Sequence, residues 1–239
     1  MSLYVYCLGD ELSEGCFAGV AGVGRACVRV LRLGRLAAVV SDAEGAAAAL
    51  TDENVLAHNR VNAAALAVST PLPFRFGARA TPERLAEYAS ANEAALLEGL
   101  ARVRGCVEMS VKLMRKSEGV EQAADEGKAA GVATSGGGRG TAFLMSKRRE
   151  LLGEEEERRC AESAAAWLAA GVSGLVRETA ARLSPSEKIA VRAAHLVERS
   201  RVGEYRERVR SLGAGRADLR LLASGPWPPY SFADIRVQR

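Results

Sequence analysis

Three prolines and three aromatic residues share eight consecutive positions near the end of the chain, residues 225–232. Proline fixes the φ angle and removes the backbone N–H donor, so this segment can be neither a helix nor a central strand. We expect any preceding strand to end at Gly225 and the chain to continue as a stiff, extended segment, whose rings pack on the rest of the protein rather than on a partner. This segment is called the strap below and consists of Gly225, Pro226, Trp227, Pro228, Pro229, Tyr230, Ser231 and Phe232.

Length and composition predict two modest domains. The chain has 239 residues, of which 48% are hydrophobic, and this is enough for two domains that each bury a core. No apolar run approaches the roughly 20 residues that span a bilayer, and no basic leader precedes the first strand-like residues. The five cysteines are scattered without a C-x-x-C pair, which disfavours a zinc site and fits a reducing compartment. We expect a cytoplasmic protein without a membrane partner.

The charge pattern gives little support to nucleic-acid binding. The net charge is +4, and acidic residues are interleaved with basic ones along the chain. A nucleic-acid interface usually concentrates Lys and Arg on one face. We therefore expect most charges to lie on solvated surfaces, and we expect no nucleic-acid partner.

The first half of the chain has the pattern of an α+β domain, residues 1–115. Thr51 and Thr81 are typical helix starts, because a Thr side chain accepts hydrogen bonds from the N–H groups of the first helical turn. The first helix should end before Pro71, since the residue ahead of a proline avoids the helical region. Strands are predicted where apolar residues alternate, with the helices on one face of a single sheet: residues 3–7, a hairpin of 28–33 and 36–41, 72–76 and 106–114.

The second half begins with a linker, residues 116–140, whose content of Glu, Gln, Ala and Gly is typical of flexible chain. A long helical pattern extends from Thr141 to Leu183, and glycines at 153 and 171–174 predict a bend or break within it. A strand, an amphipathic helix and a last strand complete a smaller α+β domain, residues 141–239. These three elements are expected at residues 188–198, 203–212 and 218–224.

Residues that could do chemistry are few and isolated. The two histidines, His58 and His195, have no partner at metal-ligand spacing, and we expect His195 to lie at a strand surface or to be satisfied by the backbone. The glycine-rich segments 19–24 and 136–140 lack the order of a dinucleotide-binding loop and the Lys-Ser/Thr of a P-loop. No G-x-S-x-G elbow is present. We therefore predict no enzyme activity, no catalytic or metal-binding residue and no cofactor.

Two segments keep a binding interpretation. Phe74 and Phe76 flank Arg75, so in a strand both rings face one side and the guanidinium faces the other. This alternation fits two core aromatics with an exposed arginine, but an Arg75 held in a groove would also anchor a partner. On the first helix, His58 shares a face with Asn62, which fits either a solvated surface or a contact patch.

Several segments, in a fixed order along essentially the whole chain, resemble the GvpF/GvpL family of gas vesicle proteins. The most specific are the strap and the sequence Leu72-Pro73-Phe74-Arg75-Phe76-Gly77. The sequence departs from the family pattern at His195, where an aromatic ring would be expected, and in the length of the 116–140 linker. Weaker matches lie at Tyr4-Val5-Tyr6, Ala38-Val39-Val40-Ser41, His58-Asn59-x-Val61, residues 105–112 and residues 140–144.

The resemblance implies a cytoplasmic accessory protein of gas vesicle formation. It also implies an N-terminal α+β domain related to the ferredoxin-like arrangement, followed by a smaller α+β domain with a long helical segment. It implies no catalysis. The quoted segments do not distinguish an F-type from an L-type member.

A physical mechanism accompanies this resemblance. A gas vesicle wall excludes liquid water from its inner face, so its small shell subunit exposes apolar surface and tends to aggregate before assembly. Our hypothesis is that this protein binds the major shell protein, keeps it soluble and supports vesicle nucleation or assembly, either as a carrier or as a minor vesicle component. The expected contacts are the edge of 72–77 and the helix face near His58 and Asn62. Other gas vesicle accessory proteins are further expected partners. The alternatives are an RNA-binding module and a ligand-sensing ferredoxin-like regulatory module.

Overall fold

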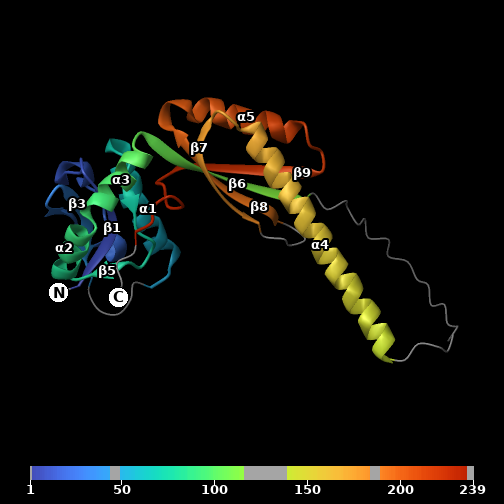
Figure 1. Cartoon of the computed structure of the whole chain (residues 1–239). Coiled ribbons are helices and arrows are strands. Elements are labelled where there is room, and N and C mark those ends of the chain that lie inside the picture. Colours follow the sequence, from blue (N-terminus) through green and yellow to red (C-terminus); the bar gives the residue numbers. More distant parts are fainter. Residues whose placement is uncertain (1, 44–48, 116–138, 184–188, 236–239) are drawn as a thin grey trace.

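Two antiparallel sheets and five α-helices make up the described part of the chain (Figure 1). The computed structural model describes residues 2–43, 49–115, 139–183 and 189–235. One sheet belongs to the N-terminal part, and the other is built mostly from C-terminal residues, which confirms the predicted α+β class. The predicted linker at 116–140 lies almost wholly outside the described residues, and the domain limits 1–115 and 141–239 stay a prediction.

The first sheet has β1 (Leu3–Gly9) at its centre, in the order β2–β3–β1–β4, and β5 also pairs with β1. The predicted hairpin is confirmed as β2 (Val28–Leu33) and β3 (Leu36–Asp42), joined across Gly34, whose φ of +66° suits glycine. The predicted strand at 72–76 is shorter, because prolines 71 and 73 cannot donate to a ladder. It is reduced to β4 (Leu72–Pro73), and a separate short strand that was not predicted, β5 (Arg79–Ala80), follows beyond a turn.

Helices cover both faces of the first sheet, where the sequence had led us to expect one covered face. All seven residues of β1 are buried, so neither of its faces is left to solvent. One face packs on α2 (Pro82–Ala91) and α3 (Glu93–Val103), and the other packs on α1 (Asp52–Val68). The predicted helix starts are confirmed, because the hydroxyls of Thr51 and Thr81 each accept a backbone N–H at 3.3 Å. Two 3₁₀ turns, Glu14–Phe17 and Val23–Arg25, lie between β1 and β2.

The second sheet has the order β7–β8–β6–β9. Its central strand β6 (Cys106–Arg115) was expected to complete the first sheet, and that expectation is wrong. Pairing explains the difference, because β6 bonds to β8 along nearly its whole length and to β9 on its other side. The other strands are β7 (Val176–Leu183), β8 (Ile189–Glu198) and β9 (Leu219–Trp227).

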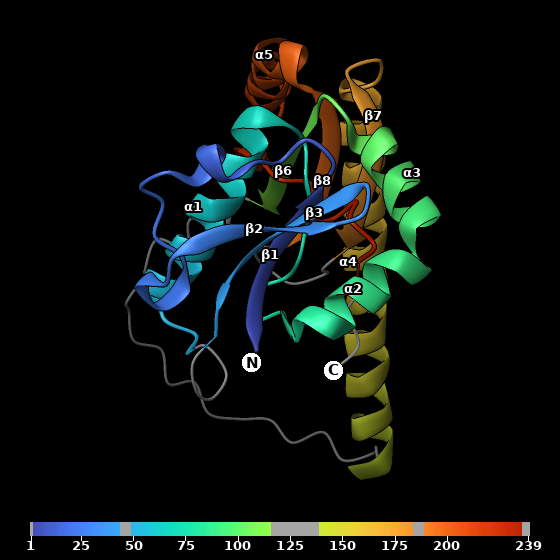
Figure 2. The same ribbon diagram turned by 90° about the vertical axis from the view of Figure 1, so that its left-hand side faces the viewer.

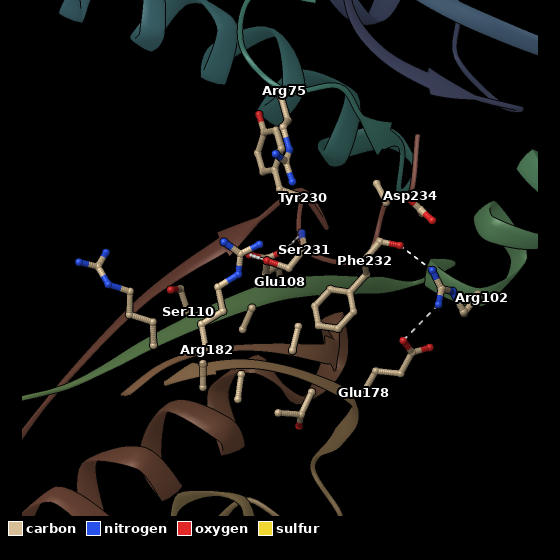
Figure 3. Close-up of a pocket in the computed structure, with 17 residues that line it drawn as sticks. Arg75, Arg102, Glu108, Ser110, Glu178, Arg182, Tyr230, Ser231, Phe232 and Asp234 are labelled. Atoms are coloured by element: carbon tan, nitrogen blue, oxygen red, sulfur yellow. Dashed lines mark hydrogen bonds and ion pairs between the residues drawn. The ribbon is translucent and has the colours of Figure 1, made fainter. Parts of the chain in front are cut away.

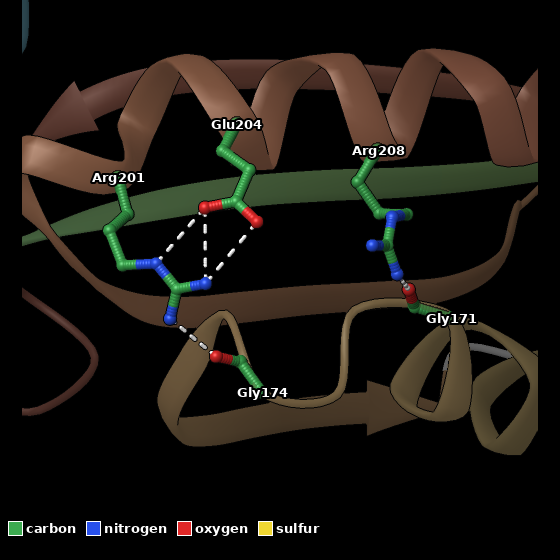
Figure 4. A network of polar contacts seen from close by, with 5 residues as sticks. All are labelled: Gly171, Gly174, Arg201, Glu204 and Arg208. Carbon is green, nitrogen blue, oxygen red and sulfur yellow. Dashed lines mark hydrogen bonds and ion pairs between the residues drawn. The ribbon is translucent and has the colours of Figure 1, made fainter.

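Two helices cover one face of this second sheet (Figure 1), namely α4 (Arg139–Gly171) and α5 (Val202–Ala214), which follows a 3₁₀ turn at Arg199–Arg201. The predicted helix from 141 to 183 is correct only as far as Gly171, and α4 runs through position 153 without a break. Gly174, with a φ of +78°, turns the chain into β7. Two arginines bind backbone carbonyls in the segment between α4 and β7 (Figure 4). Arg208 of α5 donates through Nη1 to the Gly171 carbonyl at 3.1 Å. Arg201, in the 3₁₀ turn before α5, donates through Nη1 to the Gly174 carbonyl at 2.5 Å.

Hydrogen bonds connect elements of the first sheet's layer with strands of the second sheet. Figure 2 shows the chain from the side of the N-terminal part. Arg199, at the end of β8, donates through Nη2 to the carbonyl of Leu66 in α1 at 2.6 Å. Thr70 Oγ1 donates to the carbonyl of Cys106 at 2.9 Å, at the point where β6 begins. The strap adds further links, and these shape the candidate site.

Candidate partner-binding groove

The strap leaves the second sheet and is tethered to β6. The strand β9 extends to Trp227 rather than ending at Gly225 as predicted, and Trp227 pairs with Glu108. Position 225 requires glycine, because its φ is +121° and a Cβ there would lie 2.8 Å from the Glu108 carbonyl oxygen. The Glu108 carboxylate then accepts hydrogen bonds from the backbone N–H of Ser231 at 2.7 Å and from its hydroxyl at 3.0 Å (Figure 3).

Two of the three strap rings pack within the molecule. Phe232 is buried in the core shared by β1, β3 and α3, and Arg102 Nη2 donates to its carbonyl at 2.6 Å. Tyr230 is half-buried, and burial raises its pKa. Trp227 differs, because 42% of its surface is exposed. The expected packing of the strap on its own protein therefore holds for Tyr230 and Phe232 but is wrong for Trp227.

His58 belongs to a buried polar cluster beneath the strap. Its Nε2 lies 3.0 Å from the Asn62 amide nitrogen, and its Nδ1 lies 3.0 Å from Tyr4 Oη. The Tyr4 hydroxyl accepts the backbone N–H of Gly77 at 2.9 Å. Burial lowers the pKa of His58 to about 4, which keeps the ring neutral at physiological pH. The cluster therefore links β1, α1 and the segment after β4.

This burial corrects part of the predicted contact set. His58, Asn62 and Phe74 are at most 2% exposed, so they offer no atoms to a partner. Phe76 is half-buried, and its ring packs edge-on against Tyr4. Arg75 alone among the five predicted residues is exposed. A partner-binding role for Arg75 and Phe76 stays a prediction.

Arg75 lines a groove of about 710 Å³ formed by the segment after β4, the strap and the second sheet (Figure 3). Arg182 of β7 and Arg192 of β8 line it from the sheet. Two of its carboxylates are engaged within the molecule, since Glu108 binds Ser231 and Glu178 forms an ion pair with Arg102 at 3.4 Å. Burial raises the pKa of Glu108. The accessible charge in the groove is therefore mainly positive.

Sequence reasoning missed Arg182 and Arg192. Residues 176–183 are rich in Ala, Arg and Glu, which favour a helix, and a helix would have placed Arg182 far from β8. The contrary signal was a turn glycine, Gly174, followed by the β-branched Val176 and Thr179. That signal is too weak to outweigh the helical composition around it.

His195, expected at a strand surface or satisfied by the backbone, is instead buried and bonded to a side chain. Its Nδ1 lies 2.6 Å from the hydroxyl of Tyr205 in α5. Burial lowers the pKa of His195 to about 4 and raises that of Tyr205. Elsewhere in the described ranges, no three His, Cys, Asp or Glu side chains gather as metal ligands would. None of the described helices is long and apolar enough to cross a bilayer.

The fold recurs in solved structures of gas vesicle proteins. Residues 2–234 match the family of Gas vesicle synthesis protein GvpL/GvpF. Gas vesicle protein F2 of Halobacterium salinarum (strain ATCC 700922 / JCM 11081 / NRC-1) is 28% identical over 241 residues, covering 98% of this chain and 93% of that protein. The crystal structure of GvpF from Anabaena sp. PCC7120 has a TM-score of 0.76 and 19% identity, covering 98% of this chain and 97% of that one. For GvpF from Microcystis aeruginosa the TM-score is 0.71 and the identity 18%, with 98% and 99% covered.

The two antiparallel sheets and their helices thus form a GvpF-like fold. The chain belongs to the GvpL/GvpF family of gas vesicle proteins, as the resemblance of its motifs predicted. Its role is therefore connected with gas vesicles.

Proposed function

We propose that this protein is an accessory factor of gas vesicle formation that binds the major shell protein, keeps it soluble and supports nucleation or assembly. The observation that carries the proposal is the match to the GvpL/GvpF family along residues 2–234. A shell subunit that presents apolar surface needs a soluble partner before assembly, since such surfaces associate non-specifically in water. This role needs a shaped surface and no reactive group.

Arg75 is the contact that we assign to this role. Its backbone is fixed by the buried Phe74 before it and the half-buried Phe76 after it, while its own side chain lies exposed in the groove. A fixed backbone at Arg75 means that only its side chain must be ordered on binding, and arginine is enriched among the residues that contribute most to interfaces. The strand edge proposed from the sequence contributes little, because β4 has only two residues.

The RNA-binding alternative finds less support in the first sheet. A ferredoxin-like sheet binds RNA by stacking bases on exposed aromatic rings. In this protein the aromatic residues of β1, Tyr4 and Tyr6, are at most 2% exposed and are covered by α1. Described strands of this sheet therefore present no ring for stacking.

Co-expression with the major shell protein, followed by pull-down on a tag of this chain, tests the proposal. The intact chain should recover soluble shell protein, and Arg75→Ala should recover about tenfold less at equal expression. Arg84→Ala is the matched control, because Arg84 is exposed on α2 away from the groove, and it should behave as the intact chain. Shell protein that stays insoluble and unbound beside the intact chain would refute the carrier role. Undiminished binding by Arg75→Ala would restrict Arg75 to a structural role.

A further inference from the structure

A row of three cations crosses the face of the second sheet opposite α4 and α5. Strand register places Arg182 of β7 directly opposite Arg192 of β8, and Arg192 directly opposite Lys112 of β6. We call these three residues the basic row. Arg182 points away from the sheet on the side of the strap (Figure 3).

The basic row is exposed, and no carboxylate of the described residues forms an ion pair with it. All three side chains are solvent-exposed, and among the described residues none of them forms an ion pair or hydrogen bond. Like charges directly opposite on neighbouring strands repel each other, so this order is unfavourable for the sheet itself. Exposed arginines elsewhere in the protein are commonly paired, for example Arg177 with Glu198 and Arg29 with Asp42. The lack of pairing in the row indicates a surface arranged for an anionic partner.

Apolar residues continue this face on the edge strand. Leu222 of β9 lies opposite Lys112, and 42% of its surface is exposed. Trp227 lies on the same edge, where its Nε1 donates to Ser224 Oγ at 3.3 Å. Ser224 in turn pairs with Ser110, next to the basic row along β6. Leu222 therefore borders the basic row directly, and Trp227 lies further along the same edge, opposite Glu108.

We propose that this face binds an acidic amphipathic helix of a partner protein. Neighbouring strands are about 4.8 Å apart, and residues spaced three or four apart on a helix are about 5–6 Å from each other. A helix lying across the strands therefore brings carboxylates at i, i+3 and i+7 over Lys112, Arg192 and Arg182. An apolar residue one turn further along the helix covers Leu222, which continues the line of the row on β9.

A helix fits this surface better than a nucleic acid does. The row holds three cations over three strands, a short stretch of charge that matches one face of a helix, whereas a nucleic acid contacts a longer basic track with its continuous backbone. Single-stranded nucleic acids also require several stacking rings, whereas Trp227 is the one exposed ring on this face in the described chain. Leu222 offers a base nothing to stack on or to hydrogen-bond with.

This inference goes beyond the proposed function, because it concerns the chemistry of a helix and not the identity of the shell protein. The probe is a fluorescent helical peptide of about 18 residues, with Glu at i, i+3 and i+7 positions and Leu one turn further along the helix. Its fluorescence anisotropy with the full chain should show saturable binding that weakens as salt increases. Arg192→Glu should weaken binding about tenfold or more, since it reverses the central charge.

A matched variant and a matched peptide separate the effect of the row's charge from the effect of net charge. Arg84→Glu changes the net charge equally on an exposed site of α2 and should bind as the unmodified chain does. A peptide with Lys in place of each Glu should prefer Arg192→Glu over the unmodified chain. Thermal unfolding of each variant verifies that it is folded.

Three results would overturn the inference. These are no binding of the acidic peptide by the unmodified chain, an equal loss in Arg192→Glu and Arg84→Glu, or tighter binding of a single-stranded oligonucleotide than of the peptide at the same salt. Since the shell protein is absent from this experiment, its outcome is independent of the pull-down.

Discussion

His58 and His195 lie in different cores, and burial lowers the pKa of each to about 4 from a usual value of 6.5. Below pH 6.5 the unfolded chain therefore binds protons that the folded chain does not. The contribution of the two neutral histidines to the free energy of unfolding is complete above pH 6.5 and is lost progressively as the pH falls toward 4. Each histidine lowers the free energy of unfolding by about 3 kcal/mol over this range, as an order of magnitude.

The substitution His195→Gln tests this account at one residue. Gln stays neutral at every pH and keeps a hydrogen-bonding partner for the Tyr205 hydroxyl. We expect its stability to decline less between pH 7 and pH 4 than that of the unmodified chain, as measured by urea unfolding followed by circular dichroism. His58 is present in both proteins, so the difference isolates His195. Parallel declines in the two proteins would show that His195 does not titrate as described.

At the scale of the elements, the like charges of the basic row predict that Arg192→Glu raises the free energy of unfolding. Arg192→Glu converts two like-charge pairs, with Arg182 and with Lys112, into opposite-charge pairs. Each converted pair should raise the free energy of unfolding by about 0.2–1 kcal/mol. A higher thermal midpoint, with the increase reduced in high salt, is the expected result. A variant that is less stable than the unmodified chain would mean that the row is already compensated.

Local signals predicted the elements that local residues determine. The hairpin around Gly34 and the helix starts at Thr51 and Thr81 depend on neighbours in sequence, and all three were predicted correctly. The strand β7 was missed, because Ala, Arg and Glu favour a helix whereas pairing with β8 decides the structure. The membership of β6 in the second sheet was also missed, because its partner strands β8 and β9 lie more than seventy residues away in sequence.

The candidate site was predictable only in part. Arg75 is exposed between Phe74 and Phe76, as the alternation indicated. His58 and Asn62 were expected on a surface, but a helix pattern does not reveal that the strap and β1 cover that face. The basic row depends on the register of three strands from distant parts of the sequence, so no local pattern could have revealed it.

For the molecule as a whole, the strap connects the two sheets and forms one wall of the groove. Glu108 of the second sheet holds Ser231, while Phe232 lies in the core of the first sheet. The groove therefore has walls from both parts, and its shape depends on their relative position. This arrangement presents Arg75 and the basic row as a prepared surface, which is favourable for binding a partner.

The role proposed for this protein is to keep the major shell protein in solution. The most direct test dilutes denatured shell protein into buffer with an equimolar amount of this protein, and then measures the shell protein left in the supernatant after centrifugation. We predict that most of the shell protein stays soluble in a complex with this chain, whereas an unrelated soluble protein at equal concentration leaves it in the pellet. Equal sedimentation in the presence of either protein would contradict the account.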